Sequence, residues 1–123
     1  MSDHVKKFNP GEEFYFKEGC FIIEVSSSES DAEVSIAQAR VEKGQRTRWH
    51  WLDDTTERYV ILEGSGLVEV GAEAPQQVEV GDVVIIPAQT KQRITNTGPG
   101  DLKFLAICSP HFSHRHYHEM EAD

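Results

Sequence analysis

The sequence has few cysteines and no long apolar run. Its two cysteines, Cys20 and Cys108, lie far apart, and neither has a C-x-x-C redox spacing or a paired metal-ligand spacing. We interpret both as buried, reduced thiols that act as small apolar side chains. No segment approaches the roughly twenty apolar residues of a transmembrane helix, and the N-terminal residues contain no apolar stretch typical of a signal peptide. We therefore predict a cytoplasmic protein without a membrane partner.

Positive charge is also scarce. The 123 residues include 12 Lys and Arg against 21 Asp and Glu, for a formal net charge of -9. A surface of that sign repels phosphate backbones, so nucleic acid is excluded as an expected partner. The chain length has room for one domain with one core. We predict a single domain over residues 1–123, with its core at about 20–109 and a C-terminal tail at 110–123.

Helical spacing of apolar residues is nearly absent, whereas the alternation typical of strands runs through most of the chain. Glycines at short intervals, such as Gly44, Gly71 and Gly81, mark turns between short segments. About ten short strands in one domain indicate an all-β sandwich or closed barrel. The predicted strands include Cys20–Val25, Ala32–Val41, Thr47–Leu52, Glu57–Glu63, Leu67–Val70, Val78–Val80, Val83–Ile86, Lys91–Thr97 and Leu102–Ile107.

Two blocks of the sequence carry regularly spaced glycine and polar residues. The first, GQRTRWHWLDDTTERYVILEG, begins at Gly44 and contains His50 and Glu57; the second, GDVVIIPAQTKQRITN, begins at Gly81 and contains Pro87 and Asn96. In these spacings the chain resembles the cupin superfamily, whose motifs read G-x5-H-x-H-x3,4-E-x6-G and G-x5-P-x-G-x2-H-x3-N. The resemblance implies a double-stranded β-helix, the jelly-roll barrel of a small single-domain cupin.

Alternation along strands places an imidazole and a carboxylate inside such a barrel. Side chains two residues apart share a face, so Arg48, His50 and Leu52 are expected together, with Glu57 and Tyr59 on the next strand. In a closed barrel these faces converge, and a buried His–Glu pair is a plausible divalent-metal site. On a later strand the same rule groups Gln92, Ile94 and Asn96.

The chain departs from the cupin pattern at three positions. Leu52 stands where the second histidine is usual, Gln92 stands where the last histidine is usual, and Gln89 replaces a glycine. The resemblance therefore implies a reduced site for Zn, Fe, Mn or Ni, with His50 and Glu57 as ligands and Gln92 as the third. The alternative is a metal-free pocket in which His50 hydrogen-bonds Glu57 or Tyr59.

Arg48 and Tyr59 are the candidate catalytic residues. An inward Arg48 would supply a fixed cation for a carboxylate or phosphate on a ligand. Its alternatives are an ion pair with Glu57 or Glu63, or a side chain that reaches solvent. Tyr59 would act as an acid, a base or a hydrogen-bond donor; the alternative is a core aromatic residue whose hydroxyl has found a partner.

Tryptophans and histidines add two further predictions. Trp49 and Trp51 alternate with His50 and are expected on the outer face, where another sheet or a second subunit would cover them; we predict a homodimer. The tail has three open alternatives: metal binding, a solvated segment, or a lid over the barrel mouth. Its histidines are His111, His114, His116 and His118.

Together these features predict a barrel that binds a small anionic molecule. An isomerase-like or lyase-like enzyme with a divalent metal is the first hypothesis, in which the metal would act as a Lewis acid. A non-catalytic binding or sensing module is the second, because binding alone tolerates Leu52 and Gln92. The fold by itself does not choose between them.

Overall fold

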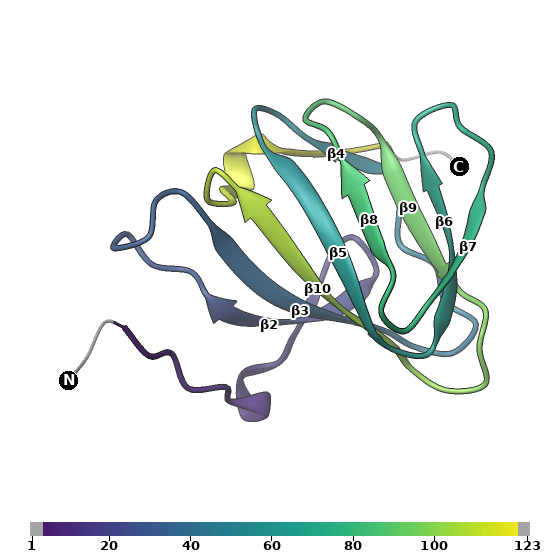
Figure 1. Cartoon of the computed structure of the whole chain (residues 1–123), viewed down its shortest axis with the longest axis horizontal. Helices are drawn as coiled ribbons and strands as arrows, with labels where there is room; N and C mark the ends of the chain where they lie inside the picture. The colour runs from purple at the N-terminus through teal and green to yellow at the C-terminus, as the bar shows by residue number, and fades with distance from the viewer. Residues whose placement is uncertain (1–3, 121–123) are drawn as a thin grey trace.

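Two antiparallel sheets face each other in the computed structural model, which describes residues 4–120 (Figure 1). The six-stranded sheet has the order β1-β2-β3-β10-β5-β8, and the five-stranded sheet has the order β11-β4-β9-β6-β7. The elements are η1 (Pro10–Glu12), β1 (Phe14–Phe16), β2 (Cys20–Ser26), β3 (Ser35–Val41), β4 (His50–Leu52), β5 (Thr56–Glu63), β6 (Ser65–Val70), β7 (Gln76–Glu79), β8 (Val83–Ile86), β9 (Gln92–Asn96), β10 (Leu102–Ser109), η2 (His114–His116) and β11 (Tyr117–Glu119).

The all-β prediction is confirmed, with differences at both ends of the chain. The short strands β1 and β11 were not expected, and they lie at one edge of each sheet. The only helical turns within residues 4–120 are the 3-10 turns η1 and η2, and no described helix is long and apolar enough to cross a membrane. The predicted strand at Thr47–Leu52 begins later, at His50.

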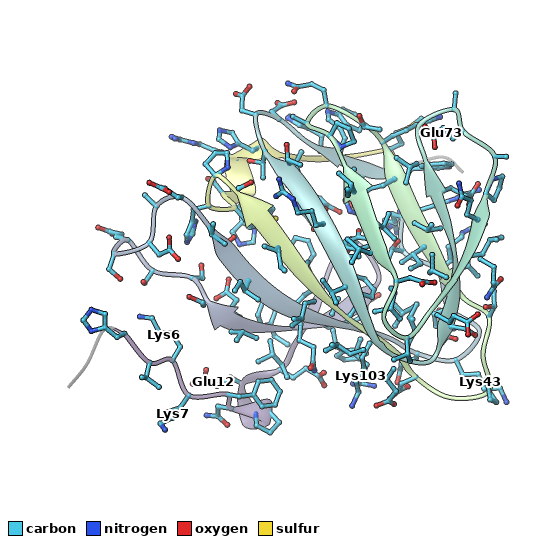
Figure 2. All side chains as sticks on the ribbon, in the orientation of Figure 1. Lys6, Lys7, Glu12, Lys43, Glu73 and Lys103 are labelled. Atoms are coloured by element: carbon cyan, nitrogen blue, oxygen red, sulfur yellow. The ribbon has the colours of Figure 1, made fainter. Side chains whose placement is uncertain are left out.

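The core lies between the two sheets, where alternate side chains of each strand meet. On β5 the buried residues are Glu57, Tyr59 and Ile61, and Figure 2 shows side chains filling the space between the sheets. Side chains two residues apart on a strand point to the same face, so the face that buries Tyr59 and Ile61 also buries the polar side chain of Glu57. The main apolar cluster comprises Cys20, Ala39, Val41, Tyr59, Ile61, Val68, Val78, Val84, Ile86, Ile94, Leu102 and Phe104.

Among the turns with left-handed backbone, those at Gly64 and Gln89 bear most directly on the barrel. Gly64, between β5 and β6, has φ +82°, and a Cβ there would lie 2.5 Å from the carbonyl oxygen of Asp101. Gln89, which stands where glycine is usual in cupins, has φ 64°. Its backbone N–H donates to the carbonyl of Leu52 over 2.8 Å, which ties this turn to the end of β4. The left-handed turn therefore persists without its glycine.

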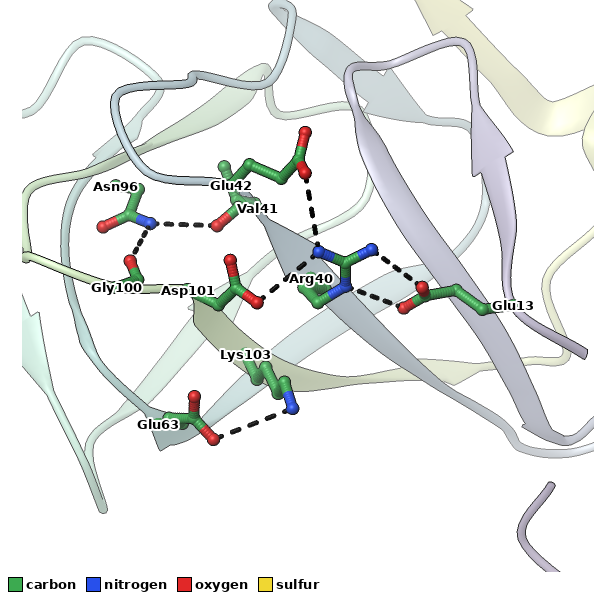
Figure 3. Close-up of polar contacts among 9 residues, drawn as sticks. All are labelled: Glu13, Arg40, Val41, Glu42, Glu63, Asn96, Gly100, Asp101 and Lys103. Carbon is green, nitrogen blue, oxygen red and sulfur yellow. Dashed lines mark hydrogen bonds and ion pairs between the residues drawn. The ribbon is translucent and has the colours of Figure 1, made fainter. Parts of the chain in front are cut away.

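Arg40 on β3 anchors the segment that precedes β1 (Figure 3). Its guanidinium donates to both carboxylate oxygens of Glu13, at 2.8 and 3.0 Å, and lies 3.5 Å from Asp101. The hydrogen bond from Arg40 outweighs the effect of burial and lowers the pKa of Glu13. The guanidinium also lies over the Phe21 ring, 4.4 Å from its centroid. These contacts hold β1 in place beside β2 as part of the barrel wall.

Candidate functional site

His50 opens β4 and is only 2% exposed. Its Nδ1 lies 2.8 Å from the carbonyl oxygen of Arg48, and because a carbonyl only accepts, Nδ1 carries the proton and donates. That bond fixes the ring so that Nε2 faces the Glu18 carboxylate, 3.7 Å from Oε1. The imidazole is therefore held inside the barrel in one orientation.

Three predicted site residues form a buried hydrogen-bonded chain. Gln92 on β9 donates from Nε2 to Glu57 Oε1 over 2.6 Å, and its Oε1 accepts a short hydrogen bond from the Tyr59 hydroxyl. Glu57 and Tyr59 share the inner face of β5, and Gln92 opens β9, next to β4. The register pairs His50 with Gln92, so strand pairing brings the members of both motif blocks together.

Glu18 belongs to this site, and sequence reasoning missed it. It lies in the turn between β1 and β2, where its Oε1 faces His50 and its Oε2 accepts from the Cys20 thiol at 3.4 Å. Cys108 on β10, interpreted above only as a buried thiol, lines the same cavity. The available signal was position: Glu18 comes just before Gly19 and the buried residue that starts a strand. Because Glu18 lies in a turn outside both motif blocks, no spacing to other polar residues marked it as a site residue.

Burial and neighbouring charge shift the pKa values of three buried residues of this site. Burial raises the pKa of Glu57 from 4.5 to about 7, with a further contribution from the Glu18 carboxylate and an opposing one from His50. Burial alone would lower the pKa of His50, but Glu18 and Glu57 outweigh it and the pKa rises. Burial also raises the pKa of Tyr59 well above 10. The site thus holds exchangeable protons on Glu57 and His50, whereas Tyr59 stays a donor.

A cavity of about 80 Å³ opens beside this cluster. It lies against the inner face of the six-stranded sheet, and β1 and the C-terminal segment contribute to its rim. A space of that size admits roughly three water-sized groups, at the volume that water takes up in the liquid. The lining residues are Phe14, Phe16, Glu18, Ile22, Glu24, Ser27, Ser35, Ile36, Ala37, Ala39, Glu57, Tyr59, Phe104, Ala106, Cys108, Phe112 and His114.

Arg48 lies outside the cavity. Its side chain is exposed, which is the solvent-reaching alternative, and its backbone N–H donates to the carbonyl of Glu18 over 2.7 Å. The face shared by His50 and Leu52 does not extend back to Arg48, because the strand begins at His50. The expected cation for an anionic ligand is therefore absent from the described residues that line the cavity.

Both tryptophans are covered by the chain's own residues. The guanidinium of Arg93 and the ammonium of Lys91 lie over the Trp49 ring, 4.3 and 4.6 Å from its centroid. Trp51 stacks on His118 with ring centroids 5.3 Å apart. The outer-face placement that motivated a homodimer thus has an explanation within one chain, and the homodimer stays a prediction.

The C-terminal tail packs against the barrel, so the lid-like alternative matches the described part of the tail. Strand β11 pairs with β4 and sets Tyr117 opposite Leu52, and the Tyr117 ring stacks on His50 with centroids 5.5 Å apart. The Tyr117 hydroxyl donates to Glu119 over 2.9 Å. Phe112 and His114 lie at the cavity, with ring centroids 5.1 Å apart. The tail therefore completes the wall around His50.

Replacing Tyr117 with alanine is expected to uncover His50. Loss of this packed ring should lower the free energy of unfolding by about 3 kcal/mol, and His50 should become reactive toward diethyl pyrocarbonate. Peptide mass spectrometry of the modified protein measures this directly. Tyr117→Phe is the matched control: it keeps the ring and loses only the bond to Glu119, a cost of about 1 kcal/mol. An unreactive His50 in Tyr117→Ala would show that the tail does not cover it.

Two of the three predicted metal ligands, Glu57 and Gln92, hydrogen-bond to each other, and His50 bonds the Arg48 carbonyl and faces Glu18 instead. Gln92 turns its nitrogen, which has no free lone pair for a metal, toward Glu57, and its oxygen is taken by Tyr59. Leu52 offers no donor atom. Within residues 4–120, no group of three or more His, Cys, Asp or Glu side chains is placed to hold an ion, the tail histidines included. The side chains as arranged do not fit a divalent-metal centre, so no step below is routed through a metal.

Comparison with known proteins agrees with the motifs. The cupin domain model matches residues 37–108, which include both motif blocks. The uncharacterized protein MJ1618 of Methanocaldococcus jannaschii is 39% identical over 80 residues, covering 65% of this chain and 63% of that protein. The chain thus spans less than two thirds of the length of this curated relative.

Solved structures share the architecture at low sequence identity. The nucleoside dehydratase Pac13 of Streptomyces has a TM-score of 0.75 at 16% identity, over 93% of this chain and 89% of that one. KdgF from Halomonas sp. has a TM-score of 0.73 at 16% identity, over 85% of this chain and 94% of that one. A predicted oxalate decarboxylase from Thermotoga maritima has a TM-score of 0.73 at 22% identity, over 85% of this chain and 98% of that one. The double-stranded β-helix prediction is confirmed. Since the matched model covers more than half of the chain and contains both motif blocks, the chain belongs to the cupin family.

Proposed function

We propose that this cupin is an isomerase-like or lyase-like enzyme that moves a proton on a small molecule held in the barrel cavity. The observation that carries the proposal is the position of Glu57: its carboxyl lines the cavity, and its pKa is raised to about 7. Isomerisation and elimination both need a group that takes a proton and returns it near working pH. Glu57 meets that need without a metal.

Each neighbour of Glu57 has a distinct part in this proposal. Tyr59 stays protonated and donates a hydrogen bond, either to Gln92 or to a ligand oxygen in the cavity. Gln92 holds one oxygen of Glu57, and the Cys108 thiol is a further hydrogen-bond partner of the same carboxyl, for which a substrate would compete. The imidazole of His50 and the carboxylate of Glu18 set the local charge. Only Glu57 and Tyr59 would touch the substrate; Gln92 and His50 are positioning residues.

The structural neighbours give limited support. A dehydratase and a predicted decarboxylase stand among them, and both names describe bond cleavage without hydrolysis. At 16% and 22% identity these likenesses concern the fold, so they support only that a barrel of this shape can house such chemistry. The choice of Glu57 as the acid–base group rests on this chain's own residues.

A non-catalytic binding module is the second candidate. The chain from Tyr59 through Gln92 to Glu57 satisfies its members' hydrogen bonds internally, which is also what a rigid binding wall needs. In that case the cavity would hold its ligand without exchanging a proton with it.

The two candidates differ in turnover. We would incubate the protein with small amino, hydroxy and keto compounds in deuterated water and follow C–H exchange and new products by NMR. Under the enzyme proposal, the wild type converts a bound compound and Glu57→Gln lowers the rate at least about 100-fold. Glu63→Gln is the matched control, because that glutamate lies on the same strand with its side chain 57% exposed. Its rate should match the wild type.

The contrary outcomes are equally specific. A ligand that binds but is never converted supports the binding module. Activity that is lost on dialysis against EDTA and restored by Zn, Fe, Mn or Ni overturns the metal-independent role of Glu57. If no compound binds in the cavity at all, both candidates fail.

A further inference from the structure

The cavity wall combines carboxylates with aromatic rings. Its three acidic residues come from three different places: Glu18 from the β1–β2 turn, Glu24 from β2 and Glu57 from β5. The register pairs Glu24 with Ala37, which also lines the cavity, so Glu24 lies on the cavity side of its strand with an exposed side chain. The rings around the same space are those of Phe14, Phe16, Tyr59, Phe104 and Phe112.

Such a wall attracts positive charge and repels negative charge. Glu57 is buried, and a carboxylate in a water-poor site interacts with a ligand charge more strongly than it would in bulk water. The face of an aromatic ring carries partial negative charge, and cations packed against several rings gain further attraction. An anion in the same place would meet like charges and would lose its hydration without a partner. The chemistry of the wall thus sets the sign of the ligand.

The positive groups near the cavity do not reverse this sign. The described residues that line it include no Lys or Arg, and His114 is the imidazole at its rim. His50 faces Glu18 and also acts on Glu57, but its imidazole carries at most one positive charge against three carboxyl groups. Lys17 lies over the Tyr117 ring, and Lys6 and Lys7 lie on the N-terminal segment, apart from the barrel (Figure 2). The exposed carboxylate of Glu24 therefore remains available to a bound cation, and so does the carboxyl of Glu57 once it is ionised.

We propose that the cavity binds a small organic cation, an amine or a quaternary ammonium compound. The volume of about 80 Å³ admits roughly three water-sized groups, so the cavity would hold the ammonium head of the ligand while the rest lies toward the rim. This inference rests on the proposed function only in using the same cavity. It replaces the anionic ligand expected from Arg48 with one of opposite charge.

Two ligand pairs that match in shape and differ in charge test the inference. Choline is compared with 3,3-dimethylbutan-1-ol, and cyclohexylamine with cyclohexanol, by calorimetry and thermal shift. In at least one pair the cation should bind at least tenfold more tightly than its neutral partner. Glu24→Gln should weaken binding of that cation by a further factor of about ten, since it removes one charge from the wall. Glu63→Gln, which removes an equal charge away from the cavity, should leave binding unchanged.

Each result has one meaning. Equal binding of cation and neutral partner in both pairs overturns the inference, as does a cation whose affinity falls equally in Glu24→Gln and Glu63→Gln. Binding of an anionic sugar acid or keto acid in preference to the cations also overturns it, and leaves the proposed function standing. If no cation, neutral compound or anion binds, both this inference and the proposed function are overturned.

Discussion

Gly64→Ala is expected to destabilise the barrel by about 3 kcal/mol, a large share of the stability of a domain of this size. Two costs add at this position. The backbone has φ +82°, a conformation that an alanine adopts only with strain, and the new methyl carbon would lie 2.5 Å from the carbonyl oxygen of Asp101. That oxygen belongs to the backbone that leads into β10, so it cannot swing aside. Urea denaturation followed by tryptophan fluorescence measures the loss.

Two other glycines separate the costs. Gly44 has φ +77° with nothing within 4 Å of an added Cβ, so Gly44→Ala isolates the backbone strain at about 1 kcal/mol. Gly100 has neither a positive φ nor a neighbour within 4 Å, so Gly100→Ala should leave stability nearly unchanged. Equal losses at Gly64 and Gly44 would show that the contact with Asp101 relaxes freely.

Glu57→Gln is expected to stabilise the protein at pH 8 by about 3 kcal/mol and to leave it nearly unchanged at pH 4.5. The folded protein holds the Glu57 proton up to a pKa of about 7, whereas the unfolded chain releases it near 4.5. This contribution to stability is fully present below pH 4.5 and is lost as the pH rises through about 7. Glutamine keeps an oxygen for Gln92 and has no proton to lose.

The melting temperature measured from pH 4.5 to pH 8 should therefore fall more steeply in the wild type than in Glu57→Gln. His50, whose pKa is also raised, adds a slope of the same sign, and this slope should be smaller in the variant because Glu57 is one of the carboxylates that raise the pKa of His50. Glu63→Gln should keep the wild-type slope. If Glu57→Gln were less stable than the wild type at every pH, the carboxylate would be ionised and stabilising in the folded protein. A gain in stability with a loss of turnover would mark Glu57 as a strained functional group.

The sequence predicted which side chains face the barrel interior wherever these residues lie on regular strands. Alternation places Glu57 and Tyr59 on one face of β5 and Gln92 on the inner face of β9, and the structure brings the three into one hydrogen-bonded chain. Burial of one face determines the direction of every second side chain, so local pattern is enough. The same rule failed for Arg48, because regular strand geometry begins only at His50.

Contacts made by turns and by distant segments could not be predicted from local pattern. Glu18 reaches His50 from a turn, and its neighbours in sequence say nothing about which strand the turn will face. The stacking of Tyr117 on His50 joins residues from opposite halves of the chain through the edge strand β11, whose three residues pair with β4. Such a short strand acquires its structure from its partner, since three residues show no reliable alternation.

The two buried thiols, Cys20 and Cys108, allow local opening of the wild-type protein to be measured without an added label site. Burial, aided by Glu18 and Glu57, raises the pKa of Cys20 and of Cys108, so the reactive thiolate is rare while the fold is closed. The rate at which a maleimide or disulfide reagent labels each cysteine then follows how often its surroundings open. Cys20 reports on the hairpin of β1 and β2, and Cys108 reports on the cavity itself. Any compound that occupies the cavity should slow labelling of Cys108, so binding can be detected even for a compound that has no optical signal and is not converted.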